Sequence, residues 1–341
     1  MSIADLAIPF ILALLPIVWL IVALVALRLP AWKAASGSFV ISCVLALAWW
    51  GMPIPEVATA SLEGFLMALW PIVLVIIAAV FTYNLCVRTG AMDVIGSMIT
   101  SLSTDRRVLA LLVAWCFGGF MEGMSGFGTA VAIPAGMLAA LGFPALQAVL
   151  ICLVANGVPT CFGSVGVPTV SLAGLTGLDP VCLAFTEMVQ LAPFFVIVPF
   201  IVVFLAAETG EECAPGAGVG TRLGGVWHIA LASGVAYALP SLAVAAFVGP
   251  ELTVVVGSLC SLIVTALLAR RPGAARDEYR MEIASTEKAT LAGALRAWSC
   301  FILIFVLLLL TSKLMPAVNA WLAQFSSCLL YTSPSPRDIS G

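Results

Sequence analysis

Apolar residues fill most of the chain in runs long enough to cross a lipid bilayer, separated by short polar stretches. A helix that spans the hydrocarbon core needs about 20 mostly apolar residues. Lipid offers no partner to the backbone groups of an open strand edge, so we expect these runs to be helical. The pattern predicts an all-α, polytopic integral membrane protein with about ten spans. They lie at residues 6–28, 36–50, 65–87, 107–121, 128–142, 145–163, 181–206, 226–246, 252–269 and 297–315.

Composition supports the bilayer as the solvent of this chain. Hydrophobic residues make up 62% of it and charged residues 9%, whereas soluble domains carry roughly 25% charge. The net charge of −3 identifies no partner. No basic patch is interleaved with aromatic residues, which argues against nucleic-acid binding. The first apolar run has no charged segment before it and no cleavage site, so we interpret it as a retained span and not a signal peptide.

The distribution of basic residues predicts the orientation. Lys and Arg gather in the first loop, in the third loop and at 270–296, whereas the loops at 51–64, 170–180 and 247–251 carry only acidic charges. Basic loops face the cytoplasm, so the N-terminus is expected on the outer side of the membrane. This arrangement, with basic loops on one side and acidic loops on the other, requires an odd number of crossings within 107–163. Three crossings satisfy it, and so does a re-entrant pair plus one crossing.

The last residues differ in character from everything before them. Residues 327–341 are polar, contain two prolines and resemble the adapter or vector read-through that ends some translated sequence assemblies. We therefore expect one membrane domain over 1–326, the N-terminal part of a longer protein, followed by a non-native tail at 327–341.

A glycine-rich segment at 117–136 holds an acid at membrane depth, Glu122, and also Pro134. So many glycines make a poor continuous helix, and irregular backbone in a membrane must be buried in protein or line a watery cavity. A helix that begins inside the membrane presents free N–H groups and a positive dipole end to an anion, as in transporter sites. The glycines could instead serve close helix packing.

The chemistry of Glu122 points to proton exchange. A charged side chain at mid-span costs about 2.5–3.5 kcal/mol on insertion scales, and acids in such places often mark ion or proton pathways. A carboxyl group in so low a dielectric is readily protonated, so it could exchange a proton near neutral pH. The alternative is a permanently protonated Glu that hydrogen-bonds a neighbouring helix.

A second broken stretch follows at 155–169. Five Gly and Pro residues exclude a regular helix there, while Asn156, Ser164 and Thr169 supply polar groups. Two interrupted segments so close in sequence predict two sides of one site, unless the second is only a loop. Glu187, early in the seventh span, shares a helix face with Gln190, and its role is open between proton coupling and a surface position.

The sequence predicts no cofactor and no metal. Ten Cys residues occur without a CxxC pair, and the chain has one His. A Cys/His metal site is therefore not expected, and most of the Cys residues are interpreted as small buried hydrophobic residues.

Two runs carry a resemblance to a known family. Glu-Gly-Met-Ser-Gly-Phe-Gly-Thr-Ala-Val-Ala-Ile at 122–133 resembles the glutamate and Gly-Phe-Gly signature of L-lactate permeases. Residues 152–168 resemble that family's Asn-x-x-Pro, Phe-Gly and Gly-x-Pro stretch. Shorter matches occur at 69–72, 78–83, 89–93, 249–252 and 295–298, in consistent order over about 10–325.

The resemblance implies a bacterial inner-membrane symporter of protons with L-lactate and similar 2-hydroxymonocarboxylates such as glycolate. It also implies inverted repeats with re-entrant hairpins. Members of that family are longer and carry a second half with its own hairpin, so this chain would hold one half of an inverted-repeat transporter. Contact with membrane lipid follows, and assembly into a homo-oligomer is left open.

The hypothesis for the site combines the two broken stretches. The substrate carboxylate would meet N–H groups around Gly126–Thr129 and Gly163–Gly166, and Glu122 would carry the proton, with Glu187 as a second proton-coupling candidate. The candidate substrate-binding residues are Ser125, Gly126, Gly128, Thr129, Asn156, Gly163, Ser164 and Gly166.

Three alternatives remain at this level. The chain could transport another carboxylate or an inorganic anion. Gly123-Met124-Ser125-Gly126 is a GxSG motif that resembles the rhomboid nucleophile, but the one His, His228, is expected at the membrane surface, away from Ser125. A channel is disfavoured because nothing repeats like a filter.

Overall fold

The computed structural model describes residues 3–126, 128–208, 222–270, 279–281 and 290–311, together with Met315, Val318 and Trp321. Within these residues every named element is a helix, as the apolar pattern predicts. The predicted tail at 327–341 lies outside the described residues, as do most of the loop after α11 and most of 270–296. The chain divides into two compact units, residues 1–74 and 75–341.

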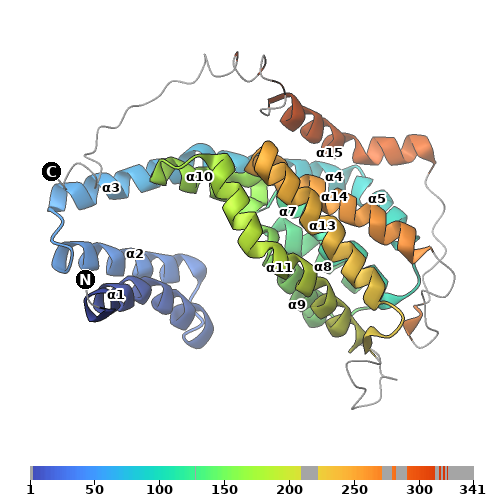
Figure 1. Cartoon of the computed structure of the whole chain (residues 1–341), viewed down its shortest axis with the longest axis horizontal. Coiled ribbons are helices and arrows are strands. Elements are labelled where there is room, and N and C mark those ends of the chain that lie inside the picture. Colours follow the sequence, from blue (N-terminus) through green and yellow to red (C-terminus); the bar gives the residue numbers. More distant parts are fainter. Residues whose placement is uncertain are drawn as a thin grey trace. The chain divides into compact units, whose positions relative to one another are not determined.

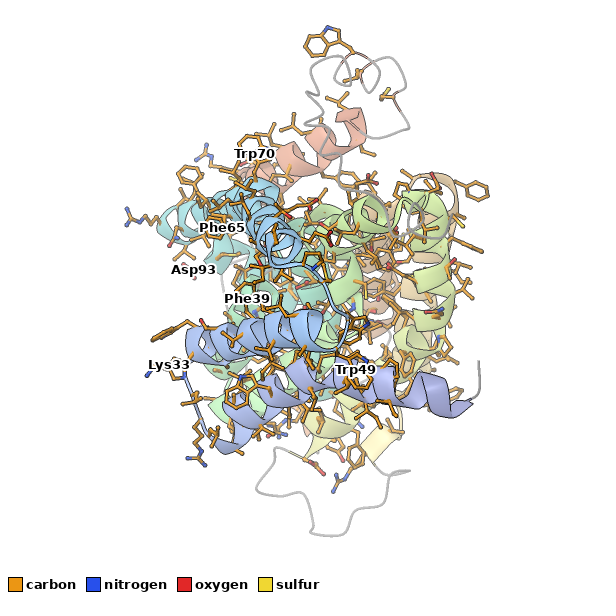
Figure 2. The ribbon with its side chains drawn as sticks, turned by 90° about the vertical axis from the view of Figure 1, so that its left-hand side faces the viewer. Lys33, Phe39, Trp49, Phe65, Trp70 and Asp93 are labelled. Atoms are coloured by element: carbon orange, nitrogen blue, oxygen red, sulfur yellow. The ribbon has the colours of Figure 1, made fainter. Side chains whose placement is uncertain are left out.

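The first unit contains an antiparallel helix pair and a third helix. Its elements are α1 (Ile3–Ile21), η1 (Val22–Ala26), α2 (Ala31–Ala48), α3 (Ile54–Met67) and η2 (Ala68–Val73). Trp19 Nε1 donates to Ala34 O at 3.1 Å and Ser38 Oγ to Pro16 O at 3.1 Å, which ties α1 to α2. Figure 2 shows Lys33 and Trp49 at opposite ends of α2, with Phe39 between them. Phe39 is 55% exposed in this unit, as expected of a lipid-facing helix.

The second unit holds the remaining helices. In chain order they are α4 (Leu74–Arg88), α5 (Ala91–Thr100), α6 (Arg106–Ala110), η3 (Leu111–Phe117), α7 (Gly118–Met124), α8 (Thr129–Ala140), α9 (Ala145–Asn156), η4 (Pro159–Phe162), α10 (Gly163–Thr176), α11 (Pro180–Ala207), α13 (Trp227–Phe247), α14 (Pro250–Ala269) and α15 (Leu291–Thr311). Helices α11, α13 and α14 lie side by side (Figure 1).

One helix forms the centre of this unit. Segments α6, η3 and α7 run continuously from Arg106 to Met124, and this apolar stretch is wholly buried inside the protein. It packs against α8, α9, α11 and α14. A membrane helix surrounded by protein has no lipid-facing side, so it can carry polar groups that lipid would exclude.

Among the described residues, six helices are long and apolar enough to cross a membrane by length and composition, or seven if one bent pair counts as a span. The six are Ile8–Ala26, Ala31–Ala48, Arg106–Met124, Pro180–Ala207, Trp227–Phe247 and Pro250–Ala269. The bent pair joins Ala145–Asn156 to Pro159–Thr176 at 66°. The predicted polytopic helical class is confirmed, while the count of ten is not.

The differences from the predicted spans have local causes. The stretch predicted at 128–142 forms α8, whose 12 residues span about 18 Å, less than the roughly 30 Å hydrocarbon core. The loop expected at 170–180 is helical as far as Thr176. The span predicted at 65–87 is interrupted at Trp70, which is extended at φ −137° and ψ 113°. The following Pro71 disfavours helical backbone at that position.

Arg107 was expected in a basic loop, but it lies inside the protein. Its side chain is fully buried and forms an ion pair with Asp105 at 2.8 Å. It also donates to Arg222 O at 2.8 Å and Gly224 O at 3.1 Å, and its guanidinium lies 3.9 Å from the ring centre of Tyr279. One arginine thus joins three connecting segments at one end of the central helix.

We predict that Arg107→Ala lowers the stability of the protein strongly. Removing one partner of a buried pair leaves the other charge uncompensated, at a cost of about 3–5 kcal/mol. Thermal unfolding of the purified protein in detergent would show a lower melting temperature, whereas Arg88→Ala, at an exposed helix end, should change it little. Equal melting temperatures for the two variants would contradict this account of Arg107.

Candidate functional site

The central helix ends where the glycine-rich motif begins. Ser125 caps α7 with non-helical backbone at φ −123°. Gly126 and Gly128 then adopt positive φ angles of 54° and 88°, a region that L side chains rarely adopt. The chain turns there and α8 begins at Thr129. The predicted break inside 117–136 is therefore confirmed at Ser125, Gly126 and Gly128, although Gly118–Met124 before it is α-helical.

The second break also lies where the sequence predicts it. Helix α9 ends at Asn156, η4 follows, and α10 starts at Gly163. Ser164, Val165 and Gly166 adopt left-handed backbone with φ of 47°, 63° and 71°. Left-handed backbone costs an L residue about 1–2 kcal/mol, and a β-branched Val is especially poor there. Such strain persists only where surrounding contacts hold it.

The two breaks contact each other. Ser164 Oγ donates to Ser125 O at 2.8 Å, and both residues are buried. A Cβ added to Gly126 would overlap Ser164 Oγ. The absence of a side chain at Gly126 thus allows the two turns to approach this closely.

Glu122 lies at the same junction, in the last turn of α7. Its side chain is buried, with 3% of the residue exposed. Oε1 lies against Gly163, where an added Cβ would overlap it. The Asn156 amide is a neighbour close enough to interact with the carboxyl group. Glu122 Oε2 and Asn156 Oδ1 have no hydrogen-bond partner among the described residues.

The hydroxyl groups of the junction are already engaged. Ser125 Oγ donates to Met121 O at 2.9 Å and lies 2.6 Å from Thr129 Oγ1, which donates to Gly126 O at 2.7 Å. Backbone N–H groups of Gly126 and Thr129 bond carbonyls in the same turn, and the N–H of Gly163 bonds Thr160 O. An anion would therefore have to displace these local bonds or use other donors in 164–166.

Other predicted residues lie at the margin of this junction. Gly128 is exposed and Thr129 is half-buried. Gly166 packs against the backbone of Pro250 so closely that a Cβ would overlap it, which sets the start of α14 against the left-handed turn. Glu187 is half-buried on α11, and its Oε2 accepts a hydrogen bond from Thr169 Oγ1 at 2.6 Å. Its hydrogen-bond partner is thus Thr169, on α10.

Polar residues that the sequence reading did not single out lie beside the central helix. Cys116 Sγ lies 3.6 Å from Ser233 Oγ, 3.4 Å from Ser261 Oγ and 3.6 Å from Thr265 Oγ1. We call these four residues the Cys116 cluster, and all are fully buried. The sequence held one indication of these residues, which is polar residues spaced four apart on a predicted helix. Two pairs have this spacing and share a helix face: Ser233 with Tyr237, and Ser261 with Thr265.

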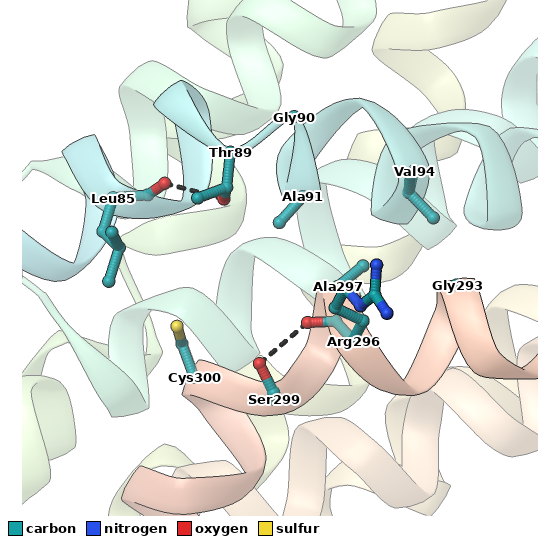
Figure 3. A pocket seen from close by; sticks show the side chains of 10 residues that line it. All are labelled: Leu85, Thr89, Gly90, Ala91, Val94, Gly293, Arg296, Ala297, Ser299 and Cys300. Carbon is teal, nitrogen blue, oxygen red and sulfur yellow. Dashed lines mark hydrogen bonds between the residues drawn. The ribbon is translucent and has the colours of Figure 1, made fainter.

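A cavity of about 330 Å³ lies elsewhere, between α4, α5 and α15 (Figure 3). Its walls are mostly apolar, with Thr89, Arg296 and Ser299 as the polar residues. None of the predicted site residues lines it. The cavity is therefore distinct from the junction around Glu122.

The GxSG motif lacks the contacts that a serine nucleophile needs. A nucleophile requires a base within hydrogen-bonding reach, whereas the Ser125 hydroxyl contacts are Met121 O and Thr129 Oγ1. His228 lies at the start of α13 with its ring 6.0 Å from that of Trp227. These contacts give no support to the protease alternative.

Comparison with known proteins decides the family. The sequence profile described as L-lactate permease matches residues 9–338. The chain belongs to the L-lactate permease family. It is 42% identical over 325 residues to the L-lactate permease of Streptococcus iniae. The aligned region covers 94% of this chain and 65% of that protein. The family's named members are transporters, which agrees with the expectation of a permease.

Two relatives from Escherichia coli K12 have lower identity to this chain. An L-lactate permease is 33% identical over 300 residues, 85% of this chain and 52% of the relative. Glycolate permease GlcA is 32% identical over 324 residues, 90% of this chain and 56% of the relative. The chain thus spans between half and two thirds of the length of these relatives. No solved structure matches it.

We predict that Gly163→Ala disturbs the junction. The added methyl group would overlap Glu122 Oε1, and overpacking of this kind costs about 1–3 kcal/mol. The matched control is Gly136→Ala, because a Cβ at this helical position in α8 meets nothing within 4 Å. Melting temperatures of the purified variants are the measurement. A decrease for Gly136→Ala as large as that for Gly163→Ala would refute the overlap.

We predict that Val165→Gly, in contrast, raises the stability of the protein. Glycine adopts left-handed backbone without the side-chain clash, so the change should relieve about 1–2 kcal/mol and raise the melting temperature. The same substitution at Val189, an exposed position in helix α11, should lower it, because glycine disfavours a helix. If both variants were destabilised alike, Val165 would not be strained.

Proposed function

We propose that this chain forms part of a secondary active transporter that carries L-lactate and related 2-hydroxymonocarboxylates together with a proton. We place it in the bacterial inner membrane, with a periplasmic N-terminus as the basic loops predict. One observation carries the mechanism: Glu122 is a buried carboxyl group where two broken helices meet, and its Oε2 has no hydrogen-bond partner among the described residues. The names of the relatives, lactate and glycolate permeases, support the substrate class.

Coupling follows from the electrostatics of a shared site. Two negative charges about 4 Å apart repel by about 4 kcal/mol at an effective dielectric constant of 20. A substrate carboxylate near Ser125 and Ser164 therefore binds well only when Glu122 carries a proton. By linkage, substrate binding then favours protonation of Glu122 by the same factor. Proton and anion occupy the site together, which is the requirement for symport.

The polar groups of the junction suit a 2-hydroxy acid. Ser125, Thr129 and Asn156 offer hydroxyl and amide groups for the carboxylate or the 2-hydroxyl group. Gly128 is exposed at the edge of the junction, Gly126, Gly163 and Gly166 are buried where the two breaks pack together, and Ser164 links the two turns. No basic side chain is needed, since helix ends attract anions through their N–H groups. Movement of the junction against the flanking helices would expose it to either side.

The test of this function is lactate uptake by the protein in proteoliposomes. With an inward proton gradient, we expect the wild type to accumulate labelled L-lactate. Glu122→Gln should abolish this accumulation and retain lactate exchange without a gradient, because Gln resembles the protonated acid in shape and charge. Glu56→Gln, at an exposed position in α3, is the control and should behave as the wild type.

Glu187→Gln separates the two coupling candidates in the same assay. If Glu187→Gln accumulates lactate as fully as the wild type, coupling is assigned to Glu122 alone. If Glu187→Gln loses accumulation while Glu122→Gln keeps it, coupling is assigned to Glu187. Accumulation that persists in Glu122→Gln would contradict the proposed mechanism. Competition by glycolate, by other carboxylates and by inorganic anions would test the substrate class, and displacement only by an inorganic anion would overturn it.

A further inference from the structure

Tyr237 holds an unusual position beside the central helix. Its ring is fully buried and packs against both Trp115 and Phe195, with ring centres at 5.0 Å and 4.8 Å, while those two rings also contact each other. These contacts fix the direction of the side chain. Its hydroxyl oxygen, Oη, has no hydrogen bond of good geometry among the described residues. Burying such a group without a partner costs about 1–3 kcal/mol, so packing alone would favour Phe here.

The hydroxyl of Tyr237 lies directly over Gly119. A Cβ added to Gly119 would overlap Tyr237 Oη, so this glycine provides the space for the hydroxyl. A second glycine, Gly257 on α14, leaves space for the ring in the same way. Ser258 is a neighbour of the hydroxyl on α14.

Gly119 is midway between two polar groups of the central helix. Gly119 is three residues from both Cys116 and Glu122, so it is a surface neighbour of each of them on the helix. Cys116 and Glu122 are about 9 Å apart along the axis at 1.5 Å per residue. Tyr237 interacts electrostatically with both of them. Glu122, Tyr237 and Cys116 are therefore neighbours in a row along the helix.

The row continues into the Cys116 cluster. Ser233 Oγ and Ser261 Oγ lie 2.9 Å apart, and Ser261 Oγ donates to Ser233 O at 2.8 Å. Cys116 Sγ reaches Thr265 Oγ1 further along α14. From Glu122 the row runs toward the end of the central helix where Arg106 and Arg107 lie, the end predicted to be cytoplasmic.

We propose that Tyr237 relays the proton between Glu122 and the Cys116 cluster. The proposal rests on the proposed proton coupling and names a path for that same site. In the relay, Tyr237 Oη accepts a proton from the Glu122 carboxyl group as its own proton passes to a bridging water molecule or to Ser258 Oγ. Each hydroxyl group or water further along gives up one proton as it receives one, through the Cys116 cluster, until a proton leaves to water at the cytoplasmic end. The O–H bond of Glu122 breaks, one O–H bond forms at Tyr237 as another breaks, and the tyrosine stays neutral. Buried water bridges polar groups in sites of this kind.

Two transport modes distinguish a relay from a packing role. Net uptake driven by a proton gradient requires Glu122 to lose its proton in every cycle. Exchange of external for internal lactate at equal pH can proceed with Glu122 protonated throughout. A lost relay therefore slows net uptake and spares exchange, whereas a damaged fold slows both.

The decisive variant is Tyr237→Phe, which removes Oη and keeps the ring. In proteoliposomes, we expect the initial rate of gradient-driven lactate uptake to fall about a hundredfold or more, the scale of a positioned proton-transfer group, with exchange unchanged. Gly119→Ala keeps the tyrosine and displaces its hydroxyl, so it should show the same pattern. Tyr279→Phe, the same chemical change at the ring beside Arg107, is the matched control and should match the wild type.

The outcomes separate the two proposals. If the wild type shows no gradient-driven accumulation, the proposed function fails and the relay fails with it. If the wild type accumulates lactate and Tyr237→Phe has an unchanged ratio of net uptake to exchange, the relay alone is wrong. A parallel loss of both modes in Tyr237→Phe and Gly119→Ala would also overturn it, because Tyr237 would then serve packing.

Discussion

The structure depends on one constraint: polar groups inside a bilayer must find partners within the protein. The central helix, Arg106–Met124, is wholly enclosed by other helices, so its polar groups face protein and not lipid. Enclosure makes room for an acid, Glu122, and for the Cys116 cluster, which lipid would exclude. It also allows the helix to stop at Ser125, because the turn that follows contacts the second broken segment through Ser164.

The same enclosure explains why glycines are concentrated at the junction. Three glycines each leave space that a polar atom of a neighbouring element occupies. Ser164 Oγ lies against Gly126, Glu122 Oε1 against Gly163, and Tyr237 Oη against Gly119. In each case the missing side chain brings a hydrogen-bonding group against the backbone of a neighbouring element. Close packing and site chemistry are therefore not alternatives here, because the glycines that allow the approach also place the polar groups.

Sequence reasoning predicted the features that depend on local rules. Helix breaks at 125–128 and 157–166 follow from Gly and Pro, and the burial of Glu122 follows from its apolar surroundings. It failed where tertiary contacts decide the outcome. Arg107 was expected in a basic loop because nothing in the sequence reveals that Asp105, Arg222 O and Gly224 O surround it. Tyr237 was missed for the same reason, since its partner Gly119 is 118 positions away in the sequence.

The central claim is that a proton and a carboxylate share the junction around Glu122. Proton uptake on substrate binding tests it most directly, measured with a pH indicator when L-lactate is added to the purified protein in weakly buffered solution above neutral pH. The account predicts that the protein takes up protons as lactate binds, up to about one per lactate by linkage, and that Glu122→Gln binds lactate without taking up any. Lactate binding without proton uptake by the wild type, or equal proton uptake by Glu122→Gln, would contradict it.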